Sequence, residues 1–447
     1  MKNSLNPKET LAIGLMLFAL FFGAGNMIFP PVLGQYAGQN MWLAIGGFLI
    51  TGVGLPLLGV IAIALTGTGA KGLADKAHPK FGTIFTLILY LSIGPFFAIP
   101  RTGTVSYEIG IAPFLSQTQS ASWVPLFLFT IVFFGITYAL ALNPSKLVDR
   151  IGKILTPILL AVIALIVIKA IATPMGAIGA PDQSYEASPL FTGFLEGYKT
   201  MDALAALVFG IVVVTAVKER GITDRKSLTA ACIKAGIVAA IGLALVYVSL
   251  AYVGASSTDT TGMVGANEGG KLLTLAANFL FGSAGNLVLG VAILFACLTT
   301  SIGLVSSCGE YFSKLFPQFS YRTVVLVVSL FSMFVANLGL AQIIALSVPV
   351  LVTIYPLAIV IILLSFIDRW INGRRAIYIV SLMFTGFFAI IDGLSEANVN
   401  LGALPKFLEG TVPLYSLGIG WLIPAFIGAF IGFLISLFIS PTKQLVS

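Results

Sequence analysis

The chain is 447 residues long, 58% of them hydrophobic and 9% charged, and it carries a formal net charge of +7. A soluble globular domain typically has about a quarter charged residues, so this composition excludes a soluble chain and indicates a membrane protein with several spans. The basic residues are dispersed along the sequence, and we therefore expect no nucleic acid partner.

Continuous apolar runs predict an all-α integral membrane protein, because a helix needs roughly 20 residues to cross a bilayer. The runs are too long for barrel strands and lack alternation with a period of two. We predict twelve spans, at about 9–35, 41–66, 81–110, 123–142, 150–171, 191–217, 228–254, 286–312, 322–338, 343–366, 375–392 and 413–440. The short apolar segment 269–281 is expected to form a helix in an outer loop.

The placement of Lys and Arg predicts the orientation of these spans, because short cytoplasmic loops accumulate positive charge. Most basic residues fall in the segments that lie on the inner side when the N-terminus is inside. We therefore expect a multi-pass membrane protein, surrounded by the lipid bilayer, with both termini cytoplasmic.

The first span contains a polar interruption near its middle, in the sequence LFALFFGAGNMIFPPVLG. Two glycines and an amide at this depth favour an unwound segment, which survives in a membrane only where it is buried in protein or lines a polar cavity. Transporters with discontinuous helices build substrate and ion sites in this way. The alternative is that Gly23, Ala24 and Gly25 are small residues that let neighbouring helices approach.

Long acidic loops at 171–189 and 392–412 divide the spans into five, five and two. Two consecutive halves of five helices enter the membrane from opposite sides, which is the topology of an inverted repeat. We expect one transporter domain over residues 1–447, with a first repeat at 9–171, a second at 191–366 and two peripheral helices at 375–440.

The sixth span is the counterpart of the first, and it has small and polar residues near its middle, in GYKTMDALAALVFG. It carries Asp202, and an acid at this depth costs about 2.5–3.5 kcal/mol on insertion scales, so it should face a cavity or a partner. A structural hydrogen bond to the loosened first span is the alternative.

The eighth span carries consecutive hydroxyls near its middle, at Thr299, Thr300 and Ser301. Single threonines in membrane helices often bond back to a carbonyl one turn earlier. Three at the depth of the interruptions in the first and sixth spans instead indicate hard oxygen ligands for a dehydrated cation such as sodium.

The stretches GLMLFALFFGAGNMIFPPVLGQYAG, GPFFAIPRTGTVSYE and ACLTTSIGLVSSCGEYF resemble the bacterial branched-chain amino acid:cation symporters, the BrnQ group, and the resemblance covers nearly the whole chain. It implies a LeuT-like fold with broken helices 1 and 6. It further implies that the break in the first span presents backbone groups to the amino acid, at Gly23, Ala24, Gly25 and Asn26. The shared sodium site of that wider group falls on Ala19, Phe22, Ala296, Thr299 and Thr300.

The sequence also departs from that wider group. The arginine that follows the break in neurotransmitter symporters is missing, and the tenth span offers no acidic partner for a charged outer gate. Arg101 and Glu108, seven residues apart on one face of the third span, are a candidate outer-gate pair, with a simple structural ion pair as the alternative. The seventh span has no asparagine for a second sodium shell, so we predict one sodium.

These observations predict a sodium-coupled symporter that imports leucine, isoleucine and valine by alternating access, with no organic cofactor and no obligate protein partner. The amides after the first break suit the substrate carboxylate, and the ammonium group is expected near Tyr198, Thr200, Met201 and Asp202. The alternative is a proton-coupled transporter that uses Asp202 or Glu108. We expect neither a channel nor an enzyme, because the sequence shows no selectivity filter, metal-ligand cluster or nucleotide loop.

Overall fold

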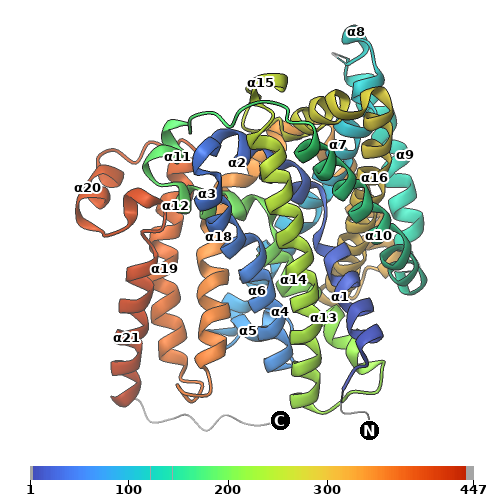
Figure 1. Cartoon of the computed structure of the whole chain (residues 1–447). Helices are drawn as coiled ribbons and strands as arrows, with labels where there is room; N and C mark the ends of the chain where they lie inside the picture. The colour runs from blue at the N-terminus through green and yellow to red at the C-terminus, as the bar shows by residue number, and fades with distance from the viewer. Residues whose placement is uncertain (1–3, 121, 143, 439–447) are drawn as a thin grey trace.

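The computed structural model describes residues 4–120, 122–142 and 144–438. This part of the chain consists of helices joined by loops and contains no β-strand, which confirms the predicted all-α class. Figure 1 shows the long helices side by side in one bundle, with the short helices α8 (Gln117–Ser120), α11 (Gln183–Ala187), α15 (Thr258–Thr261) and α20 (Leu404–Thr411) at one end of it.

The long helices follow one another with few residues between them. In chain order they are α1 (Pro7–Phe21), α2 (Ala24–Ala37), α3 (Met41–Leu49), α4 (Leu55–Thr66), α6 (Pro79–Leu91), α7 (Ala98–Gly110), α9 (Trp123–Ala141), α10 (Pro144–Ala172), α12 (Pro189–Glu196), α13 (Asp202–Lys218), α14 (Arg225–Ala255), α16 (Gly269–Leu315), α17 (Tyr321–Ala336), α18 (Leu340–Ile367), α19 (Arg375–Glu396) and α21 (Leu422–Phe438). The short helix α5 (Ala70–Ala74) lies between α4 and α6.

Seven helical stretches among the described residues are long and apolar enough to cross a membrane, or eight if the bent pair Pro189–Thr200 and Asp202–Lys218 is one span. Shorter apolar helices cover Pro157–Ala172, Tyr321–Ala336 and Leu422–Phe438. The predicted number of twelve spans therefore stays a prediction. Helix α1 begins and α21 ends on the same side of the bundle (Figure 1), while residues 1–3 and 439–447, to which the prediction of cytoplasmic termini applies, lie outside the described residues.

The span predicted at 81–110 is interrupted, which the sequence analysis did not foresee. Helix α6 ends at Leu91, a π-helical turn covers Ser92–Phe96, and α7 begins at Ala98. Gly94 has non-helical dihedral angles, φ −94° and ψ −124°. Proline has no N–H to donate to the preceding turn, so the Gly94-Pro95 pair opens the helix at this point.

The short apolar segment predicted at 269–281 is helical, and it leads into the predicted eighth span at a kink within α16. The kink is at Gly282, whose φ of 63° is readily adopted by glycine and strained for other residues.

Helix α2 lies in the core of the bundle and is buried over almost its whole length. It packs backbone to backbone against α14: a Cβ atom added at Gly34 would lie 1.9 Å from the Ala251 carbonyl oxygen, and one added at Gly254 would lie 1.8 Å from the Pro31 carbonyl oxygen. Small residues permit such close helix crossings in membranes. The crossing holds α2 in position at the centre of the molecule.

This crossing predicts different outcomes for the same substitution at two helical glycines. Gly254→Ala should lower the thermal midpoint of the protein in detergent, because the new methyl group overlaps the Pro31 carbonyl. Gly135→Ala in α9 is the control, since no atom lies within 4 Å of a Cβ there, and it should keep or raise the midpoint because alanine favours a helix over glycine by about 1 kcal/mol. Equal midpoints for the two variants would contradict the close crossing.

Candidate functional site

The helix that begins the chain stops at Phe21, and a new helix begins at Ala24. Between them, Phe22 has φ −72° and ψ 89°, and Gly23 is extended. The carbonyls at the end of α1 and the amides at the start of α2 therefore have no partners within their own helices. The Asn26 side chain satisfies one of these groups, because its Oδ1 accepts a hydrogen bond from the Gly23 amide at 3.0 Å.

A second discontinuity separates α12 from α13, which are bent by 47° at the break. A 3₁₀ turn over Gly197–Thr200 leads into Met201, which adopts the left-handed conformation with φ 65° and ψ 9°. For a residue other than glycine, such a conformation costs about 1–3 kcal/mol and persists only where surrounding contacts enforce it.

A buried polar cluster joins the two breaks. Asn26 Nδ2 donates to Asp202 Oδ2 at 2.6 Å, and the Tyr247 hydroxyl of α14 donates to the same oxygen at 2.7 Å. Asn26 Nδ2 also donates to the Tyr247 hydroxyl oxygen. The Asp202 carboxylate therefore accepts a hydrogen bond from Asn26, the side chain that caps the first break. This bond resembles the structural alternative, a hydrogen bond between Asp202 and the loosened first span. Asp202 also lines a cavity.

The end of α1 faces the hydroxyl-rich part of α16. Thr300 Oγ1 lies 3.3 Å from the Phe22 carbonyl oxygen, and a Cβ added at Gly23 would lie 2.9 Å from Thr300 Cγ2. Thr299 Oγ1 donates back to the Ala296 carbonyl at 2.6 Å, which is the local bond that threonine often makes in membrane helices. The structure therefore brings Thr300 to the break. Thr299 directly precedes it, Ala296 lies about one turn earlier on the same helix, and Ala19 is in the last turn of α1.

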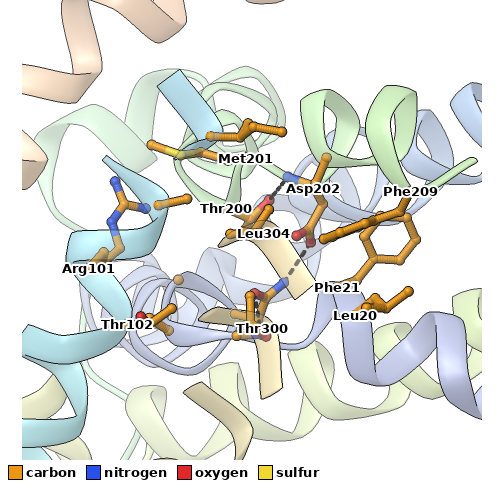
Figure 2. A pocket seen from close by; sticks show the side chains of 17 residues that line it. Leu20, Phe21, Arg101, Thr102, Thr200, Met201, Asp202, Phe209, Thr300 and Leu304 are labelled. Atoms are coloured by element: carbon orange, nitrogen blue, oxygen red, sulfur yellow. Dashed lines mark hydrogen bonds between the residues drawn. The ribbon is translucent and has the colours of Figure 1, made fainter. Parts of the chain in front are cut away.

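Both breaks line a small cavity of about 30 Å³, which has room for about two water molecules. Figure 2 shows its lining: polar groups come from the breaks and from α7, and apolar side chains surround them. The predicted residues among those that line it are Gly23, Ala24, Gly25, Asn26, Thr200, Met201, Asp202 and Thr300. The cavity combines free helix ends, one carboxylate and an apolar wall.

Tyr198 and the predicted gate pair, Arg101 and Glu108, do not have the arrangement that the sequence predicts. Tyr198 is buried next to the second break but is not part of the lining, and its ring stacks on Tyr355 with centroids 4.2 Å apart. Arg101 and Glu108 are not brought together. The Arg101 guanidinium donates to the Lys199 carbonyl at 2.6 Å and to Ser347 Oγ at 3.1 Å, and none of the ion pairs found in the described residues joins it to Glu108.

The predicted outer-gate pair is therefore not formed, for a structural reason. Both residues lie in α7 and on the same face of it, but about two turns apart. Arg101 is 2% exposed in the interior and lines the cavity, whereas the Glu108 carboxylate lies beside Gly270. Helical spacing predicts that the two residues share a face, but it does not predict that their side chains contact different neighbours.

Sequence reasoning also missed several lining residues, which come from α1, the third span, α13 and α16. They are Leu20, Phe21, Ile93, Ala98, Thr102, Ala205, Phe209 and Leu304. Ile93 and Ala98 flank the interruption of the third span, and the Gly94-Pro95 pair was the signal that could have revealed it. Tyr247 gave no signal, because one tyrosine in an apolar helix is ordinary.

A helical membrane bundle in which two discontinuous helices meet at a buried polar cavity has the architecture of a secondary transporter. Solved structures support the fold. The chain is similar to Mhp1, a nucleobase-cation-symport-1 family transporter in a closed conformation with bromovinylhydantoin bound, with a TM-score of 0.66 at 15% identity over 99% of this chain and 97% of that one. It is also similar to MhsT in complex with L-phenylalanine, with a TM-score of 0.58 at 16% identity over 95% and 98% of the chains.

Sequence comparison gives the family. Residues 6–439 match the profile described as "Branched-chain amino acid transport protein", so the chain belongs to this family. It is 65% identical to the branched-chain amino acid permease BraB of Bacillus subtilis, over 100% of this chain and 99% of BraB. It is 48% identical to the branched-chain amino acid transport system 2 carrier protein of Pseudomonas aeruginosa, over 93% of each chain. The chain is thus a transport protein and not an enzyme.

The polar cluster at the breaks predicts a stability effect. Tyr247→Phe should lower the thermal midpoint in detergent, because it removes a hydrogen bond from the buried Asp202 carboxylate, a loss of about 1–3 kcal/mol. Tyr107→Phe is the control, since the Tyr107 hydroxyl is buried without a hydrogen-bond partner in the described structure, and its midpoint should not fall. A Tyr247→Phe midpoint equal to that of the control would show that the cluster does not hold the breaks together.

Proposed function

We propose that the chain is a sodium-coupled symporter that imports branched-chain amino acids across the bacterial plasma membrane by alternating access. The observation that carries this proposal is the contact of Thr300 with the Phe22 carbonyl, beside a cavity lined by both breaks. The printed names of its relatives, which are branched-chain amino acid permeases and carriers, support the choice of substrate.

The chemistry of the lining suits an amino acid with an apolar side chain. Binding requires the helices around the breaks to move apart, because the cavity of about 30 Å³ is far smaller than such a ligand. The free amides and positive dipole end of α2 favour the carboxylate at Gly23, Ala24, Gly25 and Asn26. The ammonium group is proposed to lie near Thr200, Met201 and Asp202, where a carboxylate and a loosened backbone are available. Leucine, isoleucine or valine would gain about 1.5–3 kcal/mol by burying its side chain against Phe21, Phe209 and the other apolar lining residues.

The proposed sodium ligands are oxygens from two helices. Phe22 and Ala19 offer carbonyls at the end of α1, and Ala296, Thr299 and Thr300 offer a carbonyl and two hydroxyls on α16. The 3.3 Å contact between Thr300 and Phe22 supports this site, because hydroxyl and carbonyl oxygens suit a hard cation without a full counter-charge. Sodium is the cargo that couples transport, with one ion in each cycle, and by joining α1 to α16 it would favour the state that accepts the substrate.

The membrane arrangement is part of the proposal. We take α1 with α2, and α12 with α13, as the broken first spans of two inverted five-helix repeats, at 9–171 and 191–366, followed by two peripheral helices. Both breaks line one cavity, and Asn26 of the first break bonds Asp202 of the second, which supports this pairing. Twelve spans would leave both termini on the cytoplasmic side, in agreement with the excess of basic residues there.

Transport in liposomes tests the function. We expect an inward sodium gradient to drive uptake of labelled leucine, and replacement of external sodium by choline at fixed pH to abolish it. The rival is a proton-coupled transporter in which Asp202 takes up the driving proton. Uptake that a pH gradient drives without sodium, and that Asp202→Asn removes, would favour the rival and contradict sodium coupling.

Substitution at the proposed cation site gives a second prediction. Thr300→Ala should raise the sodium concentration for half-maximal leucine uptake by on the order of tenfold, since a contact with a charge contributes about 1.5–3 kcal/mol. Thr274→Ala is the control, because the Thr274 hydroxyl, also on α16, makes a local bond to the Gly270 carbonyl at 2.9 Å, far from the break. An unchanged sodium dependence in Thr300→Ala would contradict the assignment.

A further inference from the structure

Arg101 is a buried cation without a carboxylate partner in the described part of the chain. Its side chain is among the largest that are fully buried, and the residue is 2% exposed. Its guanidinium donates to two neutral acceptors, the Lys199 carbonyl and the Ser347 hydroxyl, and its Nε has no hydrogen-bond partner. No described carboxylate lies within ion-pair distance of it.

An uncompensated buried charge is costly, and it becomes favourable only when an anion with good geometry approaches it. Guanidinium has five donors in a planar fork that matches a carboxylate. Because Arg101 lines the cavity, an anion in the cavity can reach its remaining donors. The missing counter-charge is therefore one that a ligand can supply.

The position of Arg101 shows which end of a ligand it meets. Its Nη1 lies 3.4 Å from the point that a Cβ at Gly25 would occupy, so it is beside the start of α2. The Phe29 ring, one turn along α2, packs 5.3 Å from the guanidinium carbon. The first amides of α2 have no partners within their helix. These amides and Arg101 can therefore bind the same anion.

The opposite charge lies elsewhere in the cavity. Figure 2 shows Arg101 on α7 well apart from Asp202 on α13, with Thr200 between them in the view. Asn26 and the Tyr247 hydroxyl both bond the Asp202 carboxylate at Oδ2. A cavity with a cation at one end and a carboxylate at the other matches the two charges of an amino acid zwitterion.

We propose that Arg101 binds the substrate's carboxylate and thereby makes the cavity selective for ligands that carry an α-carboxylate. This inference rests on the proposed function and adds a substrate contact to it. The substrate carboxylate completes the ion pair that the protein leaves open, together with the amides of Ala24 and Gly25. Arg101 also donates to the Lys199 carbonyl at the second break, so a bound carboxylate connects α2, α7 and the α12–α13 break.

The alternative role is a purely structural one, in which Arg101 only holds the Lys199 carbonyl. The two roles predict different effects of a carboxylate on the ligand. A structural arginine stabilises the cavity for every ligand equally, whereas a carboxylate-binding arginine strengthens binding only of ligands with a carboxylate.

The test compares leucine with leucinol, which keeps the ammonium group and side chain and lacks the carboxylate. Titration calorimetry on the purified full chain at saturating sodium gives both affinities. Wild-type protein should prefer leucine, and Arg101→Gln should weaken leucine binding by about 10- to 100-fold, the range of a hydrogen bond to a charge, while leucinol binding changes little. The ratio of the two affinities should therefore fall at least about tenfold.

Ser347→Ala is the matched variant, because it removes one hydrogen-bond partner of Arg101 and keeps the positive charge of Arg101. The ratio of the leucine and leucinol affinities should stay that of the wild type. Arg101→Lys keeps the positive charge but lacks the planar guanidinium, so it should retain part of the preference for leucine over leucinol. If Arg101→Gln does not fold, Arg101→Lys carries the test.

The outcomes separate this inference from the proposed function. Equal weakening of leucine and leucinol in Arg101→Gln, or in Arg101→Lys when it stands in, overturns carboxylate binding and leaves a structural arginine. Equal affinity of the wild type for leucine and leucinol also overturns it. A wild type that binds neither ligand contradicts the proposed function itself.

A second measurement, the thermal midpoint with and without leucine, also distinguishes carboxylate binding from a structural role. The substrate-free midpoint of Arg101→Gln should not fall below that of the wild type, because the variant removes an unpaired buried charge. Leucine should raise the wild-type midpoint, as a ligand of the folded state does, and should lose this effect in the variant. A lowered substrate-free midpoint with the full leucine effect retained would overturn the proposal.

Discussion

The structure depends on how the backbone groups freed between Phe21 and Ala24 are satisfied in a membrane protein. Hydrocarbon offers no partner for an open carbonyl or amide, so a broken helix is stable only where other groups meet its ends. The Asn26 side chain accepts a hydrogen bond from the Gly23 amide, and the Thr300 hydroxyl donates one to the Phe22 carbonyl. The groups that remain open face a cavity, where a ligand can bind them.

The same requirement joins the rest of the bundle to the site. Helix α2 is held against α14 by glycines at Gly34 and Gly254, and α14 supplies Tyr247, which bonds Asp202 at the second break. Helix α7 supplies Arg101, which bonds the Lys199 carbonyl at that break. Movement of any of these helices therefore changes the shape and charge of the cavity, which is the physical link that alternating access needs.

The sequence predicted the parts of the site that consist of polar residues in long apolar runs. Gly23, Asn26, Asp202 and Thr300 each interrupt a membrane helix pattern, and the structure brings them to one cavity. It did not predict that Arg101 lies in the interior beside the second break, because helical spacing shows which residues share a face and not which neighbours that face packs against. Tyr247 and Phe209 could not be predicted, since aromatic residues in apolar helices are common and only tertiary packing selects those that reach a site.

The central claim is that one cavity, bounded by the two breaks and by Thr300, binds a cation and an amino acid that stabilise each other. Binding linkage requires that each ligand change the affinity of the other by the same factor. The most direct measurement is the affinity of the purified protein for leucine in sodium and in choline at equal ionic strength, together with its affinity for sodium with and without leucine. The account predicts that both affinities rise and that the two factors agree. A leucine affinity that does not depend on sodium would contradict it.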